Sequence, residues 1–311
     1  MAGRRAWRAA VALLVGPALV AGLVLVAGCT APAERPGHRP RLSDVDSWVY
    51  QLQGYPGGRL DRLAKAPQPL AVIDLTRDGR RSYFSRAEVG ALRDSGKLVL
   101  AYFEVGSIED FRPEYAGLDR GLLLDDVSGW PGERFVRYWS DDWWRTVVRP
   151  RIDRAIAAGY DGAYLDTLLA YQEIDLARVP GRDRAGLAAD AVALVRRISA
   201  YAKARRPGFL VVPQNSPELG RRADYRRAID GIGIEELYFQ DTDEACRADF
   251  CAENRTDVRR LRDAGKLVLA VDYARRPANR AAACAAYRRE GFAGYVTTVD
   301  LDTVSAPCPG T

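Results

Sequence analysis

The sequence predicts an α/β protein that forms a single (β/α)8 barrel, the fold also called a TIM barrel. Eight apolar runs of strand length occur along the 311 residues, and helical patterns lie between most of them. A phrase that occurs twice, at residues 92–104 and 261–273, indicates repeated units in which a helix leads into a buried strand. Eight strands alternating with helices over about 250 residues are typical of the barrel, and a doubly wound sheet is the alternative.

The first 28 residues are not expected to belong to the barrel. Three arginines precede an apolar run at residues 9–27, which ends in "VAG" directly before Cys29. This pattern predicts a secretory signal peptide at residues 1–28, and its end resembles a bacterial lipobox, in which the cysteine becomes the lipidated first residue. We therefore expect Cys29 to carry lipid. An uncleaved membrane anchor is the alternative, because the run is nearly long enough to span a bilayer.

Residues 29–44 include "TAPAERPGHRP" and predict a Pro-rich tether, so that the barrel occupies residues 45–311. The protein is expected to be exported and lipid-anchored to the cell envelope, or secreted. The membrane is then a partner through the N-terminal anchor.

The expected strands follow a helix end or a turn and consist mainly of apolar residues. They are residues 48–53, 70–74, 98–103, 162–166, 209–213, 232–236, 267–272 and 294–298. The expected helices are residues 85–96, 143–159, 184–208, 256–265 and 279–291. A further apolar run at 134–139 is assigned to the long loop after the third strand.

Two phrases occur twice. "LRDSGKLVLAYFE" at 92–104 is repeated as "LRDAGKLVLAVDY" at 261–273, and "GYDGAYLD" at 159–166 resembles "GFAGYVTT" at 291–298. The copies fall on strands three and seven and on strands four and eight, as a duplicated half-barrel would place them. The alternative is that helix-to-strand junctions reuse the same turn chemistry.

Charge and histidine content exclude several function classes. The net charge is +5, of which three charges belong to signal-peptide arginines, so residues 29–311 carry +2. This excess is too small to indicate nucleic-acid binding. The only histidine, His38, lies in the tether, which excludes a histidine-based zinc site and a Ser-His-Asp triad. No metal or cofactor is expected.

Four cysteines remain after Cys29, and an even number in an exported chain predicts disulfides. Three pairings are possible. We expect Cys246 to pair with Cys251, which closes a short loop, and Cys284 to pair with Cys308, which fastens the C-terminal tail to a late helix.

Polar side chains collect at the ends of the expected strands, where the active site of such a barrel lies. A single acid at such a position is often only a helix cap, but several on one rim favour a functional site. The residues concerned are Asp74, Glu104, Asp166, Gln214, Asn215, Glu235, Glu236 and Asp272.

The alternation of side chains along a strand indicates which acids point inward. In "GIGIEE" the two glycines share a face with Glu235, whereas the two isoleucines share the other face with Glu236. We therefore expect Glu235 to point into the barrel. Asp166 shares its face with Tyr164, so this tyrosine is expected beneath the acid.

Four motifs resemble the endo-α-1,4-polygalactosaminidases of glycoside hydrolase family 114. They are "AYFEVGSIEDFRPEY", "GYDGAYLD", "VVPQN" followed by Pro-Glu, and "GIGIEELYF", and they occur in the family's order between residues 48 and 302. The resemblance implies a barrel that hydrolyses an amino-sugar polysaccharide, namely an α-1,4-linked galactosaminoglycan, with Asp166 and Glu235 as the catalytic pair. Thr167 and Leu237 depart from the family pattern, so another glycan is an alternative substrate.

Glycoside hydrolysis needs one protonated and one ionised carboxyl group. We expect Glu235 to be the general acid, because apolar Ile234 and the charge of Glu236 would raise its pKa. Asp166 would be the nucleophile, held ionised by the hydroxyls of Thr167 and Tyr164, although the two roles could be exchanged.

Other residues on the rim are expected to bind substrate. Acids there would favour a cationic amino sugar, and the tryptophan in "SGWPGE" would stack on a sugar ring. The expected substrate contacts are Asp74, Tyr102, Glu104, Trp130, Asn215, Glu236 and Asp272. The competing interpretation is a non-catalytic glycan-binding lipoprotein on the same barrel.

Overall fold

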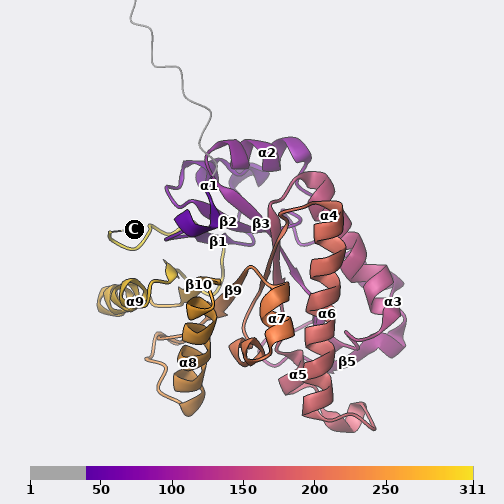
Figure 1. Cartoon of the computed structure of the whole chain (residues 1–311). Helices are drawn as coiled ribbons and strands as arrows, with labels where there is room; N and C mark the ends of the chain where they lie inside the picture. The colour runs from indigo at the N-terminus through magenta and orange to yellow at the C-terminus, as the bar shows by residue number, and fades with distance from the viewer. Residues whose placement is uncertain (1–39, 311) are drawn as a thin grey trace, which may run out of the picture. The chain divides into compact units, whose positions relative to one another are not determined.

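The computed structural model describes residues 40–310, and these form a (β/α)8 barrel (Figure 1). The predictions of a signal peptide, of lipidation at Cys29 and of most of the tether, with His38, lie outside the described residues. Among residues 40–310, no helix is both long and apolar enough to cross a membrane.

The eight expected strands are all present within this part of the chain. They are β1 (Val49–Gln51), β2 (Leu70–Asp74), β3 (Leu98–Glu104), β7 (Gly162–Asp166), β8 (Leu210–Pro213), β9 (Gly231–Glu235), β10 (Leu267–Asp272) and β11 (Ala293–Val296). Each of these strands begins and ends within two residues of its predicted bounds.

The strands are parallel and form two arcs, β1-β2-β3-β7-β8 and β9-β10-β11. Single parallel bridges join the arcs at both seams, between Ser47 and Gly294 and between Gln214 and Gly233. These bridges close the barrel in the order of the sequence, which confirms the predicted fold class.

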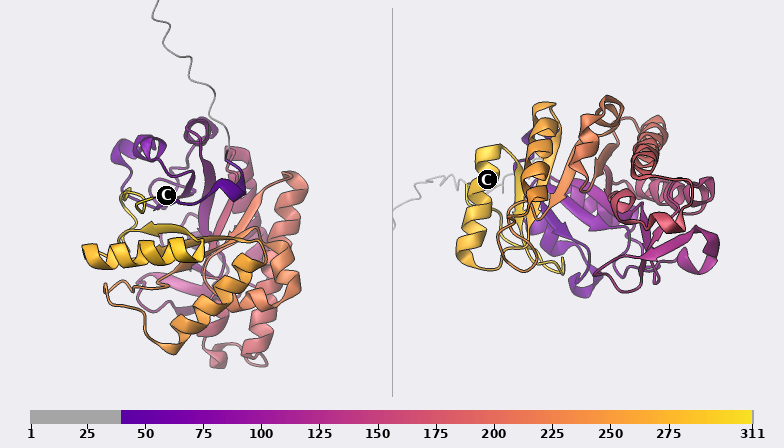
Figure 2. Two further views of the ribbon diagram at one scale, coloured as in Figure 1. Left: turned by 60° about the vertical axis from the view of Figure 1, so that its left-hand side comes forward. Right: turned by 90° about the horizontal axis from the view of Figure 1, so that it is seen from below.

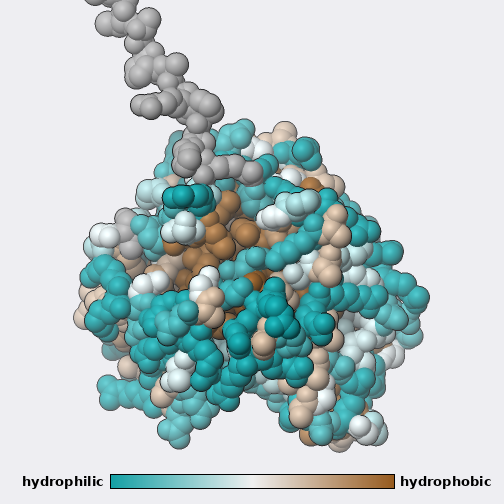
Figure 3. Space-filling model, in the orientation of Figure 1, coloured by the Kyte–Doolittle hydropathy of each residue, from teal (hydrophilic) through white to brown (hydrophobic). Residues whose placement is uncertain are grey.

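Helices follow the strands and lie outside them, as the right-hand view of Figure 2 shows for α6 to α9. Their polar outer surfaces colour most of the face in Figure 3 teal, while apolar residues gather in a hollow in its upper part. The helices are α1 (Asp61–Lys65), α2 (Arg86–Asp94), α3 (Asp141–Trp143), α4 (Arg149–Ala158), α5 (Ala170–Glu173), α6 (Arg184–Arg205), α7 (Ala223–Ala228), α8 (Asp249–Asp263) and α9 (Pro277–Glu290).

Local sequence signals set the helix ends. Ser85 and Glu88 form a capping box at the start of α2, which satisfies two free backbone N–H groups. A π-helical turn, Trp144–Val148, joins α3 to α4. Gly159 and Gly291 end α4 and α9 in the left-handed conformation, with φ of 89° and 69°.

The long connection after β3 forms a small antiparallel sheet of its own, which we call the excursion sheet. Its strands are β4 (Ser107–Glu109), β5 (Leu123–Asp126) and β6 (Glu133–Val136), in the order β4-β6-β5. The run at 134–139 thus lies in the connection as predicted, but its first part is a strand rather than a loop because it pairs on both sides.

The C-terminal tail follows β11 and returns along the first strand, where Leu52 N–H donates to the Leu301 carbonyl at 2.8 Å. The disulfide between Cys284 and Cys308 ties this tail to α9, and the disulfide between Cys246 and Cys251 ties the loop after β9 to the first turn of α8. Both pairings agree with the prediction.

The barrel interior is filled mainly by aromatic rings. Tyr50 stacks against Trp48 and also contacts Tyr164, both with ring centroids 5.3 Å apart. The facing strand provides space for Tyr164, because a Cβ on Gly233 would lie 2.0 Å from the Tyr164 hydroxyl oxygen. Large rings opposite glycine therefore fill the core below the strand ends.

The two repeated phrases differ in how well they match in space. The copies at 92–104 and 261–273 put equivalent residues on the same faces of β3 and β10. In the other pair, Gly162 faces Leu100 and Leu210 of neighbouring strands, whereas Gly294 faces Tyr287 of the outer helix α9. The second likeness is therefore explained by shared turn chemistry, since the glycines occupy opposite faces of the barrel wall.

Candidate active site

Two carboxyl groups lie at the C-terminal end of the barrel, at the last residues of β7 and β9. Asp166 and Glu235 are partly exposed, although every other residue of these two strands is buried. Both point inward: Asp166 hydrogen bonds to a side chain of β3, and Glu235 to one that follows β10. The inward orientation of Glu235 agrees with the alternation in the sequence.

Asp166 accepts two hydrogen bonds. The Tyr102 hydroxyl donates to Oδ2 at 2.6 Å, and the Thr167 N–H donates to Oδ1 at 2.5 Å. The Thr167 hydroxyl instead lies 3.1 Å from the Gly106 nitrogen and 2.8 Å from the Ser107 hydroxyl oxygen. The sequence-based expectation that the Thr167 hydroxyl holds Asp166 is therefore wrong, because its backbone N–H does so.

Glu235 accepts hydrogen bonds from three side chains. The Tyr273 hydroxyl donates to Oε1, Asn215 Nδ2 donates to Oε2 at 3.3 Å, and Gln214 also donates to the carboxyl group. Asn215 in turn accepts the Glu235 N–H at 3.2 Å. The loop after β8 and the residue after β10 thus fix the Glu235 side chain.

Tyr164 lies beneath the two acids, as expected. Its side chain is fully buried, and its hydroxyl has no hydrogen-bond partner among the described residues. The charges of Glu235 and Asp166, added to burial, raise the pKa of this hydroxyl. Tyr164 therefore stays neutral and forms an uncharged floor below the pair.

The electrostatics of the pair favour protonation. Burial, and after it the charge of Glu235, raises the pKa of Asp166 to about 7. Burial also raises the pKa of Glu235, but the hydrogen bonds from Tyr273, Asn215 and Gln214 oppose this rise. Two carboxyl groups with raised pKa values in one site are a recurrent arrangement for acid and base roles.

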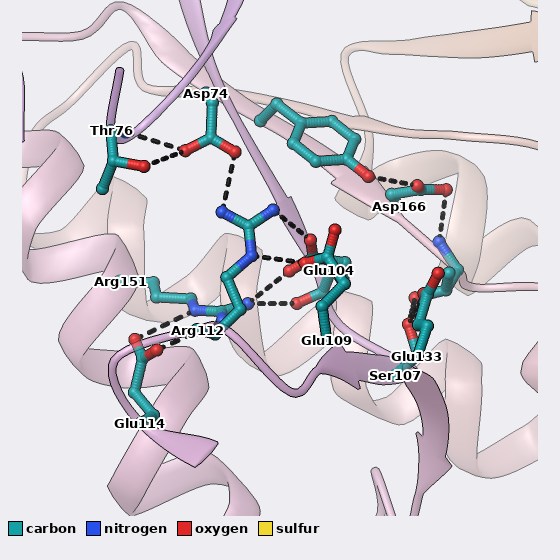
Figure 4. Close-up of polar contacts among 12 residues, drawn as sticks. Asp74, Thr76, Glu104, Ser107, Glu109, Arg112, Glu114, Glu133, Arg151 and Asp166 are labelled. Carbon is teal, nitrogen blue, oxygen red and sulfur yellow. Dashed lines mark hydrogen bonds and ion pairs between the residues drawn. The ribbon is translucent and has the colours of Figure 1, made fainter. Parts of the chain in front are cut away.

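Asp74 and Glu104 do not lie open on the rim, because two buried arginines hold them (Figure 4). Arg112 donates to Asp74 at 2.7 Å and also pairs with Glu104, while Arg151 donates to Glu104 at 2.8 Å. Both acids are almost fully buried. Their assignment as substrate contacts does not fit this geometry, because the arginines and, for Asp74, Thr76 already bind their oxygens.

Arg112 also pairs with Glu109, so that it joins three carboxyl groups. Burial and the charge of Glu104 raise the pKa of Glu109 to about 10, whereas Arg112 and Arg151 hold the pKa of Glu104 below its ordinary value. Glu109 is therefore neutral and Glu104 ionised near neutral pH.

Asp272 also differs from expectation. It points away from the barrel axis, is fully buried, and accepts the N–H groups of Tyr238 and Phe239 at 2.8 and 2.7 Å and the Tyr287 hydroxyl. It therefore holds the loop after β9 against α9 and does not face the rim.

The remaining expected contacts occupy different places. Asn215 and Tyr102 touch the two acids directly, as described above. Glu236 follows Glu235 in a left-handed conformation with φ of 54°, and it accepts the Asp241 N–H at 2.9 Å. Trp130 lies in the turn between β5 and β6 and is 55% exposed.

Sequence reasoning missed Tyr273, Arg112 and Arg151. The repeat could have revealed Tyr273, because residue 273 in the second copy corresponds to Glu104 in the first and therefore shares its inward face. The arginines gave no such signal, since they come from the excursion after β3 and from the outer helix α4.

The acids nearest the centre are not neutralised by cations. Among residues 40–310, the ion pairs involve neither Asp166 nor Glu235, and also neither Glu133 nor Glu236. The site therefore combines an outer layer of acids paired with arginines and a centre whose acids have no cationic partner in the described part of the chain.

Comparison with known proteins identifies the family of the chain. The family model described as glycoside-hydrolase family GH114 matches residues 29–311. An uncharacterized protein of Deinococcus radiodurans is 34% identical over 278 residues, covering 88% of this chain and 87% of that protein. An uncharacterized protein of Thermotoga maritima is 28% identical over 274 residues, covering 82% and 78%.

Two solved structures share the fold. Aspergillus fumigatus Ega3 in complex with galactosamine has a TM-score of 0.67 at 18% identity, covering 86% of this chain and 97% of that one. The glycoside hydrolase domain of PelA from Pseudomonas aeruginosa has a TM-score of 0.65 at 20% identity, covering 84% and 98%. The resemblance seen in the four motifs is confirmed: the chain belongs to glycoside-hydrolase family GH114 and is a glycoside hydrolase.

Proposed function

We propose that this glycoside hydrolase is exported and cleaves an amino-sugar polysaccharide, an α-1,4-linked galactosaminoglycan, with Asp166 and Glu235 as its catalytic pair. One observation carries the proposal: two inward-facing carboxyl groups with raised pKa values stand at strand ends of the barrel. In such a pair one group protonates the leaving oxygen, and the other attacks the anomeric carbon or activates water.

The hydrogen bonds support the exchanged order of roles. Asp166, whose pKa is raised to about 7, is suited to donate a proton near neutral pH. Glu235 accepts bonds from three side chains, and hydrogen bonds to a carboxylate favour its ionised form. We therefore assign Asp166 as the general acid and Glu235 as the ionised partner.

Two observations support the substrate class. The structurally similar Ega3 is solved in complex with galactosamine, whose amine is protonated near neutral pH. The centre of the site holds acids without a cationic partner in the described part of the chain. A positively charged sugar would be attracted to such a centre.

Export and lipid attachment rest on other features. Two disulfides are typical of proteins outside the cytoplasm. The family match begins at Cys29, directly after the segment interpreted as a signal peptide. The intact mass of the exported protein should show the loss of 28 residues and the addition of acyl groups; a chain that begins at another residue would contradict lipidation.

Release of reducing ends from a galactosaminoglycan tests the enzymatic proposal. Wild-type protein should release them, while Asp166→Asn and Glu235→Gln should lose about 10² to 10⁴ in rate, because each keeps the shape but removes the titrating group. If wild-type protein binds the polymer but never cleaves it or related glycans, the glycan-binding alternative is correct.

An aryl oligogalactosaminide with a good leaving group tests the order of roles, since such a leaving group needs little help from an acid. Asp166→Asn should then recover much of its rate, and Glu235→Gln should not. Recovery by Glu235→Gln alone would restore the order expected from the sequence.

A further inference from the structure

A chain of hydrogen bonds leads from Asp166 into the excursion sheet. Thr167 donates its N–H to Asp166 at 2.5 Å, its hydroxyl oxygen lies 2.8 Å from that of Ser107, and the Ser107 hydroxyl reaches the carboxyl group of Glu133 (Figure 4). All three residues are more than nine-tenths buried. We call Thr167, Ser107 and Glu133 the hydroxyl relay.

Thr167 is held in an unfavourable backbone conformation. Its φ is 55°, in the left-handed region that β-branched residues rarely adopt. The turn after β3 fixes it there: Val105 N–H donates to the Asp166 carbonyl at 2.9 Å, and Gly106 N–H donates to the Thr167 hydroxyl at 3.1 Å. A Cβ on Gly106 would lie 2.1 Å from the Thr167 carbonyl oxygen, so only glycine permits this contact.

The number of protons on the hydroxyl groups determines the direction of the hydrogen bonds in the relay. Each hydroxyl has one proton to donate. Because Gly106 N–H already donates to the Thr167 oxygen, the Thr167 hydroxyl is free to donate to Ser107, and Ser107 then donates to Glu133. The hydroxyls of Thr167 and Ser107 both have an acceptor only while Glu133 offers an oxygen to Ser107.

We propose that Glu133 is a positioning residue for hydrolysis, acting through Ser107 and Thr167 to keep the Thr167 N–H on Asp166. The proposal rests on the catalytic role assigned to Asp166 above. It gives the excursion sheet a part in the reaction, because Glu133 and Ser107 come from β6 and β4 and not from the barrel.

The surroundings of Glu133 favour action through hydrogen bonds and not through charge. Glu104 of β3, Asp166 of β7 and Arg112 face it, and Glu109 lies directly opposite in the pairing of β4 with β6. Burial, followed by the charge of Glu104, raises the pKa of Glu133 to about 8. At neutral pH Glu133 is mainly protonated and still has an oxygen that accepts from Ser107.

The test compares substitutions that keep or remove each link, with kcat, KM and the pH profile measured on the galactosaminoglycan that wild-type protein cleaves. Thr167→Val, Ser107→Ala and Glu133→Met break the relay and should lower kcat about 10-fold with KM changed less than about 2-fold, because a misplaced catalytic group slows the chemical step. Thr167→Ser and Glu133→Gln keep a hydroxyl or an acceptor oxygen and should retain most of kcat.

The pH profile separates positioning from general damage. Loss of the Thr167 N–H bond removes a donor that stabilises ionised Asp166, so the limb that Asp166 governs should move up by about 0.5 to 1 pH unit in the three broken variants. Glu253→Met, a matched change on the exposed surface of α8, should leave the profile unchanged.

The outcomes are distinguishable. Wild-type kcat and pH profile in all three broken variants, with Asp166→Asn inactive, would overturn the relay and leave the proposed function intact. Full activity of Asp166→Asn would overturn the role of Asp166 and the relay together. If melting curves show that Thr167→Val is unfolded, Ser107→Ala and Glu133→Met decide, since they leave the strained residue in place.

Discussion

The two copies of the repeated phrase, residues 92–104 and 261–273, are built alike at one end of the barrel and differently at the other. At the N-terminal end, Lys97 donates to the carbonyls of Ala66 and Gln68, and Lys266 donates to the carbonyl of Ile229. Each lysine thus ties its strand to the chain just before the neighbouring strand. The shared letters of the phrase therefore serve the fold.

At the C-terminal end the copies diverge. The inward position carries Glu104 in one copy, where two arginines bind it, and Tyr273 in the other, where its hydroxyl donates to Glu235. The preceding, outward position carries Phe103 in one and Asp272 in the other. The difference shows how one helix–strand unit supplies a buried ion pair on one side of the site and a hydrogen-bond donor on the other.

Among the substitutions that test this comparison, Glu104→Gln should have the largest effect on stability. Glu104→Gln keeps the shape but leaves Arg112 and Arg151 short of one buried negative charge, which should lower the free energy of unfolding by about 3–5 kcal/mol. Urea denaturation measures this. The control Glu290→Gln breaks more exposed ion pairs with Arg259 and Arg262 and should cost about 1 kcal/mol or less; equal losses in both variants would show that the buried cluster is no more stabilising than an exposed one.

Asp272 should give the next largest effect, visible as a dependence of stability on pH. Its pKa is raised to about 6 by burial, above the roughly 3.9 of an ordinary aspartate. The folded state therefore binds more protons in this window, and the free energy of unfolding should fall as pH rises from about 4 to 6. Asp272→Asn should remove roughly 1–3 kcal/mol of this change. Thermal denaturation of both proteins at several pH values between about 4 and 6 measures it. The same dependence of stability on pH in the two proteins would contradict the prediction.

Part of the fold and of the site could be predicted from the sequence, and Asp272 shows where the prediction failed. The strands, both disulfides and the inward position of Glu235 could be predicted, since apolar runs, short cysteine loops and alternation are local properties. Asp272 was assigned to the rim because it ends a strand, although the repeat matches its neighbour Tyr273 to inward-facing Glu104, and alternation then places Asp272 on the outward face.

The neutralisation of Asp74 and Glu104 was beyond local patterns. Arg112 reaches them only because the chain folds back from the excursion sheet, and Arg151 reaches in from an outer helix. Likewise, the strand at β6 depends on pairing with two partners that are themselves short. The sequence therefore predicts which acids stand at strand ends, but not which of them are already bound.

Substitution of Tyr273 tests the role of the second copy in catalysis. Tyr273→Phe removes the donor to Glu235 and keeps the ring, so the pKa of Glu235 should rise and kcat should fall about 10-fold, with little change in unfolding free energy. Steady-state kinetics with denaturation curves tests this. Unchanged kcat, with the limb governed by Glu235 unmoved, would mean that the hydroxyl plays no part in catalysis.

The smallest effect is expected at Lys266, the second of the two lysines that the repeated phrase shares. Lys97 is buried and satisfies two carbonyls, whereas Lys266 is partly exposed and satisfies one. Lys97→Met should cost about 2 kcal/mol, because its carbonyls lose their donor away from water, and Lys266→Met about 1 kcal/mol or less. Urea denaturation that finds the larger loss at Lys266 would contradict the equivalence drawn between the two copies.

The most direct test of the catalytic pair is a double-mutant cycle on kcat for galactosaminoglycan cleavage, with Asp166→Asn, Glu235→Gln and the double variant. Residues that act as one unit are strongly non-additive. Each single variant should lose about 10² to 10⁴ in rate, and the double variant should be scarcely slower than the slower single. Losses that add fully in the double variant, or a single variant that keeps wild-type kcat, would contradict the assignment of Asp166 and Glu235 as the pair that performs hydrolysis.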